Sequence, residues 1–119
     1  GLAGARAAAY AAAASGGTVG IIVPAVLLPS VAEAVRSRIP GASTSGRASL
    51  DTPAVVLTPR TTKGLEFDTV VVVEPGSIVA ERDRGRHDLY VALSRATQRL
   101  IVVHAEPLPD GMQRLSSPR

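Results

Sequence analysis

The chain of 119 residues contains no cysteine and no tryptophan, and aromatic residues make up only 3% of it. Without cysteine it can form neither disulfide bonds nor cysteine-ligated metal sites, which fits a reducing cytoplasm. Because aromatic side chains are so scarce, the hydrophobic core must be built from Val, Ile, Leu and Ala. The two histidines, His87 and His104, stand too far apart in sequence for a metal cluster. We therefore expect no metal site in this chain.

Long apolar runs are also missing. No run approaches the ~20 residues that a helix needs to cross a bilayer, so we expect no membrane span. The Ala-rich start lacks a basic segment followed by a strongly apolar core, and so it does not resemble a signal peptide. A length of 119 residues allows one domain with a modest core. These absences predict a single cytoplasmic domain.

Charge is nearly balanced, with 13 basic and 10 acidic residues and a net charge of +3. This excess suits weak attraction to nucleic acid but does not establish it. Most charged residues lie in the second half of the chain, and Lys63 is the only lysine among many arginines. Either a coding bias toward arginine explains this, or a compact ammonium group is required at that position.

Short β-branched runs alternate with helical segments. Strands are expected at 18–23, 54–58, 69–73 and 100–103, and helices at 2–14, from a Ser30 N-cap to Pro40, at 77–81 and at 87–98. The strands are continuously apolar, which is typical of a parallel sheet covered on both faces. The alternation predicts a three-layer α/β domain with a mostly parallel sheet. We expect a loop at 41–53, a buried last strand and a flexible C-terminal tail at 107–119.

A polar insert of sequence RTTKGLEFD, residues 60–68, separates two of the predicted strands. It combines hydroxyl, ammonium and carboxylate groups with a glycine, which are groups that contact phosphate and sugar. Open α/β sheets bind ligands at the ends of their strands. The insert is therefore a candidate site. The alternative is a polar crossover that contains a glycine turn.

Two motifs carry a family resemblance. The sequence KGLEFD at 63–68, followed by a valine strand, resembles motif V of superfamily 1 helicases of the UvrD/Rep/PcrA type. The sequence LYVALSRA at 89–96, followed by LIVV, resembles motif VI of the same group. The sequences VVVVEP and YVALSRATQRLIVVHA, with the Pro-Leu-Pro near Leu108, are most similar to HelD-like proteins within this group.

The resemblance implies a RecA-like fold and a place within a larger protein. Residues 18–106 would form most of its second RecA-like motor domain, with motif V at 60–68 and motif VI at 89–96. Residues 1–17 would form an N-terminal helix of the same domain. The partners implied are the first RecA-like domain of the parent chain, single-stranded DNA and, for a HelD-type protein, RNA polymerase.

The resemblance also implies roles in nucleotide binding. Arg95 matches the motif VI arginine that reaches the γ-phosphate and acts as an arginine finger. Glu66 matches the motif V glutamate that binds the ATP ribose, and Gly64 would let the backbone approach the nucleotide closely. The alternatives are a surface Arg95 paired with Asp88, a Glu66 that favours a helix N-terminus, and a plain turn glycine.

The resemblance further implies contact with a nucleic-acid strand. Arg60, Thr61, Thr62 and Lys63 occupy the part of motif V that touches the backbone of single-stranded nucleic acid. UvrD-type proteins usually carry His-Ser-Ala at the first three of these positions. Arginine and hydroxyl groups can contact phosphate as well, but this departure from the family pattern leaves the strand contact open.

No G-x-x-x-x-G-K-[ST] loop and no acidic pair after a strand occurs in the chain. ATP and Mg²⁺ would therefore bind in the intact parent and not to this chain alone, which should not hydrolyse ATP by itself. Three functions stay open. They are the motor domain of a DNA helicase or translocase, the same domain of a HelD-type ATPase that recycles RNA polymerase, and a free-standing α/β binding module.

Overall fold

The computed structural model describes residues 2–14, 16–44 and 54–109. The elements are α1 (Leu2–Ala14), β1 (Val19–Ile22), η1 (Ala25–Leu27), α2 (Leu28–Arg38), β2 (Ala54–Leu57), η2 (Pro59–Thr61), β3 (Phe67–Val73), α3 (Pro75–Ala80), α4 (Gly85–Leu93) and β4 (Ala96–Val103). Most of the predicted loop at 41–53 and of the predicted flexible tail lies outside the described residues. None of the described helices is long and apolar enough to cross a membrane.

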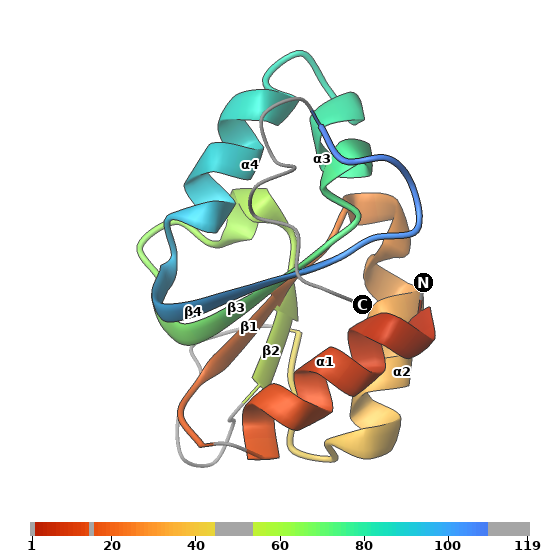
Figure 1. Ribbon diagram of the computed structural model, residues 1–119, viewed down its shortest axis with the longest axis vertical. Helices are drawn as coiled ribbons and strands as arrows, with labels where there is room; N and C mark the ends of the chain where they lie inside the picture. Colours follow the sequence, from red (N-terminus) through yellow and green to blue (C-terminus); the bar gives the residue numbers. More distant parts are fainter. Residues whose placement is uncertain (1, 15, 45–53, 110–119) are drawn as a thin grey trace.

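The four strands form one parallel sheet in the order β2-β1-β3-β4 (Figure 1). β1 pairs with β2 from Val19 opposite Ala54, and with β3 from Val19 opposite Thr69. The chain therefore has to pass β1 on its way from β2 to β3. The segment that makes this passage contains η2 and the polar insert. The predicted parallel sheet is confirmed.

Helices cover both faces of the sheet (Figure 1). On one face, α1 and α2 pack on strand residues such as Ile21, Val56 and Val71. On the other face, α3 and α4 pack on residues such as Ile22 and Phe67. The strands are apolar on both faces because both faces are buried. The three-layer arrangement is confirmed.

The Ala-rich helix α1 is held by packing. Its residues Ala5, Ala9 and Ala12 share one buried face against the sheet and α2. The guanidinium of Arg38 on α2 lies 4.4 Å from the centre of the half-exposed Tyr10 ring. This cation–π contact links α1 and α2 on their outer side.

Several helix boundaries were predicted wrongly: helix α3, expected at 77–81, begins at Pro75, and helix α4, expected to begin at 87, begins at Gly85. Helix α2 begins at Leu28, with Pro29 in its first turn, so Ser30 lies inside the helix and is not its N-cap. Helix α4 ends at Leu93, and Ala96 already belongs to β4. The chain leaves the helix early because the Arg95 carbonyl accepts a hydrogen bond from the Phe67 N–H at 3.0 Å, which begins the pairing with β3.

The prediction of a buried last strand was also wrong. β4 lies at the edge of the sheet, and Val102 is its only buried residue. Thr97, Gln98 and Arg99 are exposed. An edge strand reads as apolar in sequence when one of its faces packs on a helix layer, and its partial exposure follows only from the strand order.

Gly20 offers a test of core packing. A Cβ at Gly20 in β1 would lie 2.5–2.8 Å from three ring carbons of the buried Phe67. We expect Gly20→Ala to lower the free energy of unfolding by about 1–3 kcal/mol through overpacking. Chemical denaturation of the chain measures this. Phe67→Leu should relieve part of the loss, so the double variant should be more stable than the sum of the two single changes predicts. Strict additivity would contradict the contact.

Candidate functional site

The polar insert starts with a short, internally bonded turn. The Thr61 hydroxyl donates to the Thr58 carbonyl at 2.9 Å and accepts the Thr58 N–H at 3.2 Å. Thr62 is buried, and its hydroxyl donates to the Pro59 carbonyl at 2.7 Å. These two hydroxyls therefore stabilise η2 and the turn after it. In this conformation Thr62 does not reach the surface, whereas Arg60 is exposed.

A second turn follows at Gly64. The Leu65 N–H donates to the Thr62 carbonyl at 2.9 Å, and Gly64 adopts a φ of +78°. A turn with positive φ at its third residue favours glycine. No heavy atom of the described residues lies within 4 Å of the position that a Cβ would take on Gly64. Both the backbone conformation and the open space suit a close approach by a ligand. Glu66 is exposed just before β3.

The end of the insert is joined to the segment that carries Arg95. The Phe67 N–H donates to the Arg95 carbonyl at 3.0 Å, and the Thr97 hydroxyl donates to the Phe67 carbonyl at 3.3 Å. The register between β3 and β4 shifts between Phe67 and Thr69, which marks a bulge in β4. Asp68, opposite this bulge, accepts the Thr18 N–H at 2.9 Å. Three strands are thus tied together beside the two motifs.

Arg95 follows directly after α4. Its N–H donates to the Ala92 carbonyl at 3.1 Å, so the backbone is held in the last helical turn. Its Nε is buried and, among the described residues, meets no hydrogen-bond partner. A buried guanidinium N–H without an acceptor is costly unless a ligand supplies one. The unpaired Nε makes Arg95 a candidate anion ligand.

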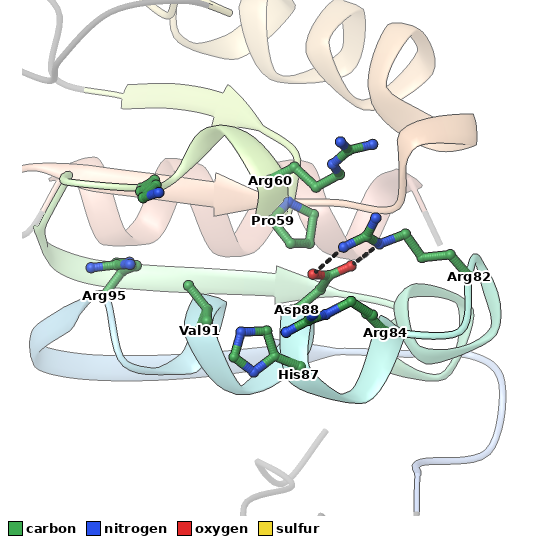
Figure 2. A pocket seen from close by; sticks show the side chains of 9 residues that line it. Pro59, Arg60, Arg82, Arg84, His87, Asp88, Val91 and Arg95 are labelled. Atoms are coloured by element: carbon green, nitrogen blue, oxygen red, sulfur yellow. Dashed lines mark hydrogen bonds and ion pairs between the residues drawn. The ribbon is translucent and has the colours of Figure 1, made fainter.

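Arg95 stands in a recess between η2 and α4 with a volume of about 430 Å³ (Figure 2). The recess is lined by Pro59, Arg60, Lys63, Arg82, Arg84, His87, Asp88, Val91 and Arg95. Five of these side chains are permanently cationic and one is a carboxylate. With His87 neutral the recess has a net charge of +4, which exceeds the +3 of the whole chain. The positive charge of this protein is concentrated here, as expected for an anion site.

The single carboxylate of the recess is paired with Arg82. The Arg82 guanidinium donates to Asp88 from Nε at 2.6 Å and from its second terminal nitrogen at 3.1 Å (Figure 2). This bidentate hydrogen bond is the main cause of a lowered pKa of Asp88, and the charges of Arg82, His87 and Arg60 lower the pKa further. The predicted alternative of an Asp88–Arg95 pair is thus replaced by an Asp88–Arg82 pair.

A tight turn between α3 and α4 positions Arg82 and Arg84. Gly85 begins α4 so close to α3 that an added Cβ would overlap the Val79 carbonyl. Because this overlap involves backbone atoms, a larger residue would have to push the two helices apart. The glycine therefore allows the arginines before it to reach the recess.

The structure brings together only some of the predicted site residues. Arg60, Lys63 and Arg95 line the recess, whereas Thr61, Thr62, Gly64 and Glu66 do not. Arg82, Arg84 and His87 were missed, because the sequence RDRGRH resembles a solvated turn. Its density of arginines directly before a helix was the only available signal. Across the described residues no cluster of His, Asp or Glu could hold a metal ion.

A family comparison and a structural comparison both find similarity to C-terminal domains of helicases. Residues 53–103 match the family described as the UvrD-like helicase C-terminal domain. Among solved structures, the chain is similar to the C-terminal domain of a possible DNA helicase from Lactobacillus plantarum WCFS1. The two share 23% identity with a TM-score of 0.72, over 97% of this chain and 73% of the other. No curated protein matches the sequence.

The Asp88–Arg82 pair predicts a pH dependence of stability. Because the pKa of Asp88 is lowered in the folded state, its contribution is present above the ordinary aspartate pKa of ~3.9 and is lost as the pH falls through the lowered value. We expect Asp88→Asn to lower the thermal midpoint slightly at about pH 7. The difference from the unchanged chain should vanish toward about pH 2. Asp83→Asn, an exposed neighbour in the same turn, should show no such trend; an equal trend there would contradict the assignment.

Proposed function

The chain belongs, over residues 53–103, to the UvrD-like helicase C-terminal domain family, and we propose that it is the second RecA-like motor domain of an ATP-dependent DNA helicase or translocase. In this function the recess faces ATP held on the first motor domain of the full-length protein. Cleft closure around ATP would be coupled to movement along single-stranded DNA. The lack of cysteine fits work in the reducing cytoplasm.

The observation that carries the proposal is Arg95 in the cationic recess. Its buried Nε has no acceptor among the described residues, and its side chain lines the recess, from which a phosphate would reach the terminal nitrogens of the guanidinium. During transfer of the γ-phosphoryl group, negative charge spreads over its equatorial oxygens. A planar guanidinium that stays charged can bind two of these oxygens at once and stabilise the transition state. Arg95 would thus act as the arginine finger.

Two motif V residues complete the nucleotide contact in this proposal. The exposed Glu66 carboxylate would accept a hydrogen bond from a ribose hydroxyl, and the open turn at Gly64 would admit the nucleotide. The main chain already links Glu66 to Arg95, because the next residue, Phe67, donates to the Arg95 carbonyl. We assign Mg²⁺ to the first domain and the ATP phosphates, since it prefers carboxylates combined with phosphate oxygens.

Arg60 and Lys63 are the proposed contacts to the nucleic-acid strand, because both are exposed cations that line the recess. Thr61 and Thr62 would act mainly by holding the loop in shape, since their hydroxyls are bonded inside it. The His-Ser-Ala contact of UvrD-type proteins would then be replaced by charge contacts to phosphate.

A HelD-type motor that recycles RNA polymerase is the second candidate. The sequences VVVVEP and YVALSRATQRLIVVHA favour it. Both candidates use the same ATP chemistry, so the separating assay is the task itself. A helicase unwinds duplex DNA with ATP, whereas a HelD-type motor releases RNA polymerase from DNA with ATP and need not unwind.

Removal of the guanidinium tests the arginine finger. In the full-length protein we expect Arg95→Ala to lower kcat for DNA-stimulated ATP hydrolysis by ~10³ or more, while folding and ATP binding are largely kept. Arg95→Lys should also be impaired, because an ammonium lacks the planar, rigid pair of N–H donors that binds two phosphate oxygens side by side. The matched control is Arg86→Ala, which removes an exposed arginine of α4 outside the recess. Near-normal turnover of Arg95→Ala would favour the binding-module alternative.

Truncation of Glu66 tests the ribose contact. We expect Glu66→Ala to raise KM for ATP by about tenfold or more with little change in kcat, because a hydrogen bond to a charged group is lost from ground and transition state alike. The variant should also discriminate less between ATP and 2′,3′-dideoxy-ATP. Glu33→Ala on α2, likewise exposed, is the control. Unchanged discrimination would remove Glu66 from the ribose site.

A further inference from the structure

The recess contains more positive charge than the proposed function uses. Arg82, Arg84 and His87 lie outside motifs V and VI, yet all three line the same recess as Arg95. They reach it from the α3–α4 turn and from the first turn of α4. Arg84 and His87 are exposed. The proposed function therefore gives no role to Arg82, Arg84 and His87.

These cations gather at the opposite end of the recess from Arg95. Figure 2 places Arg82, Arg84 and His87 beside Asp88, Arg60 across from them on η2 with its guanidinium directed away from Asp88, and Arg95 apart from all four. The two ends are separated by most of α4, whose nine residues span ~13 Å at 1.5 Å per residue. A single phosphate group is much too small to contact both ends. The two ends must therefore bind different groups.

The charges at this second end of the recess favour the binding of an anion. Like charges at close range repel one another, and surface cations gain nothing from being held together without a counter-charge. The only carboxylate in the recess, Asp88, serves Arg82 through two hydrogen bonds. The charges of Arg60 and His87 also act on this carboxylate, since they help to lower its pKa. Asp88 thus pairs with Arg82 and lies within electrostatic reach of His87 and Arg60.

We propose that Arg60, Arg84 and His87 form a second phosphate subsite for the backbone of a single nucleic-acid strand, with the Asp88–Arg82 pair as its internal counter-ion. A phosphate that enters adds the negative charge that Asp88 supplies only in part. Arg82, held by Asp88, forms the wall of the subsite rather than a direct contact. The identity of the strand rests on the proposed function; the phosphate chemistry rests on the recess itself.

The positions of the cations in the recess indicate which molecule supplies the second phosphate. A nucleotide at Arg95 would already use the other end of the recess. Arg60, which lines the recess from η2, is also one of the two strand contacts in the proposed function. A polymer of phosphates can reach both Arg60 and the α4 start in one passage, and such contacts position a strand without reading its sequence.

The test is the salt dependence of binding by the full-length protein to fluorescein-labelled oligothymidylate, without nucleotide, followed by fluorescence anisotropy. We expect Arg84→Ala and His87→Ala each to weaken binding about three- to tenfold. The log–log salt slope should become shallower by ~0.7 for Arg84→Ala, because one fewer phosphate is neutralised. Arg86→Ala, which lies between these two residues in sequence but outside the recess, should change neither quantity.

Asp88→Asn should act in the opposite direction. It removes the internal counter-ion and releases Arg82, so binding should tighten a few-fold and the salt slope should steepen by up to ~0.7. Tightening with an unchanged thermal midpoint, or despite a lowered one, supports the subsite, since loss of structure could only weaken binding. Weaker binding by Asp88→Asn in folded protein would overturn the counter-ion role.

Two further outcomes separate this inference from its rivals. If Arg84→Ala raises KM for ATP and leaves oligothymidylate binding unchanged, the subsite takes a nucleotide phosphate and the strand proposal is overturned. If Arg84→Ala and Arg86→Ala behave alike in both assays, no subsite exists. The arginine-finger test is independent: normal hydrolysis by Arg95→Ala would sink the proposed function, while weaker binding by Arg84→Ala would still support the subsite.

Discussion

The backbone hydrogen bond from Phe67 to Arg95, 3.0 Å long, is the constraint on which the site depends. It starts the pairing of β3 with β4 and so sets the register between the polar insert and the residue after α4. In a parallel sheet a slip of one residue turns every side chain to the other face. Phe67, the largest fully buried side chain of the described residues, resists such a slip by packing against Gly20. A core contact thereby helps to position Arg95.

The positive charge of this domain is distributed unevenly. A recess with a net charge of +4 sits on a domain whose total is +3, so the remainder of the chain is slightly acidic. The cations come from η2, from the α3–α4 turn and from both ends of α4. Packing of those elements on the sheet outweighs the mutual repulsion of their exposed cations, which water and salt screen. Anion binding is then favoured, because the cations are already assembled before the ligand arrives.

The proposed function explains why the site is incomplete. The chain has no phosphate-binding G-x-x-x-x-G-K-[ST] loop, and its recess offers cations and one paired carboxylate but no metal-ligand cluster in the part of the chain that the structure describes. Such a surface can stabilise charge on a phosphate that another domain holds. An arginine supplied across a cleft acts only when the cleft closes, which couples hydrolysis to domain movement.

Local sequence was sufficient for the α/β class, the parallel strands and the two motifs, because β-branched runs, glycine turns and motif spacing are short-range signals. It predicted Arg60, Lys63 and Arg95 as site residues, and the structure places all three in one recess. It could not predict that α4 ends at Leu93, that β4 is an edge strand, or that Arg82, Arg84 and His87 join the recess. Those features depend on which strands pair and how helices pack, and such long-range contacts leave no periodic trace in the sequence.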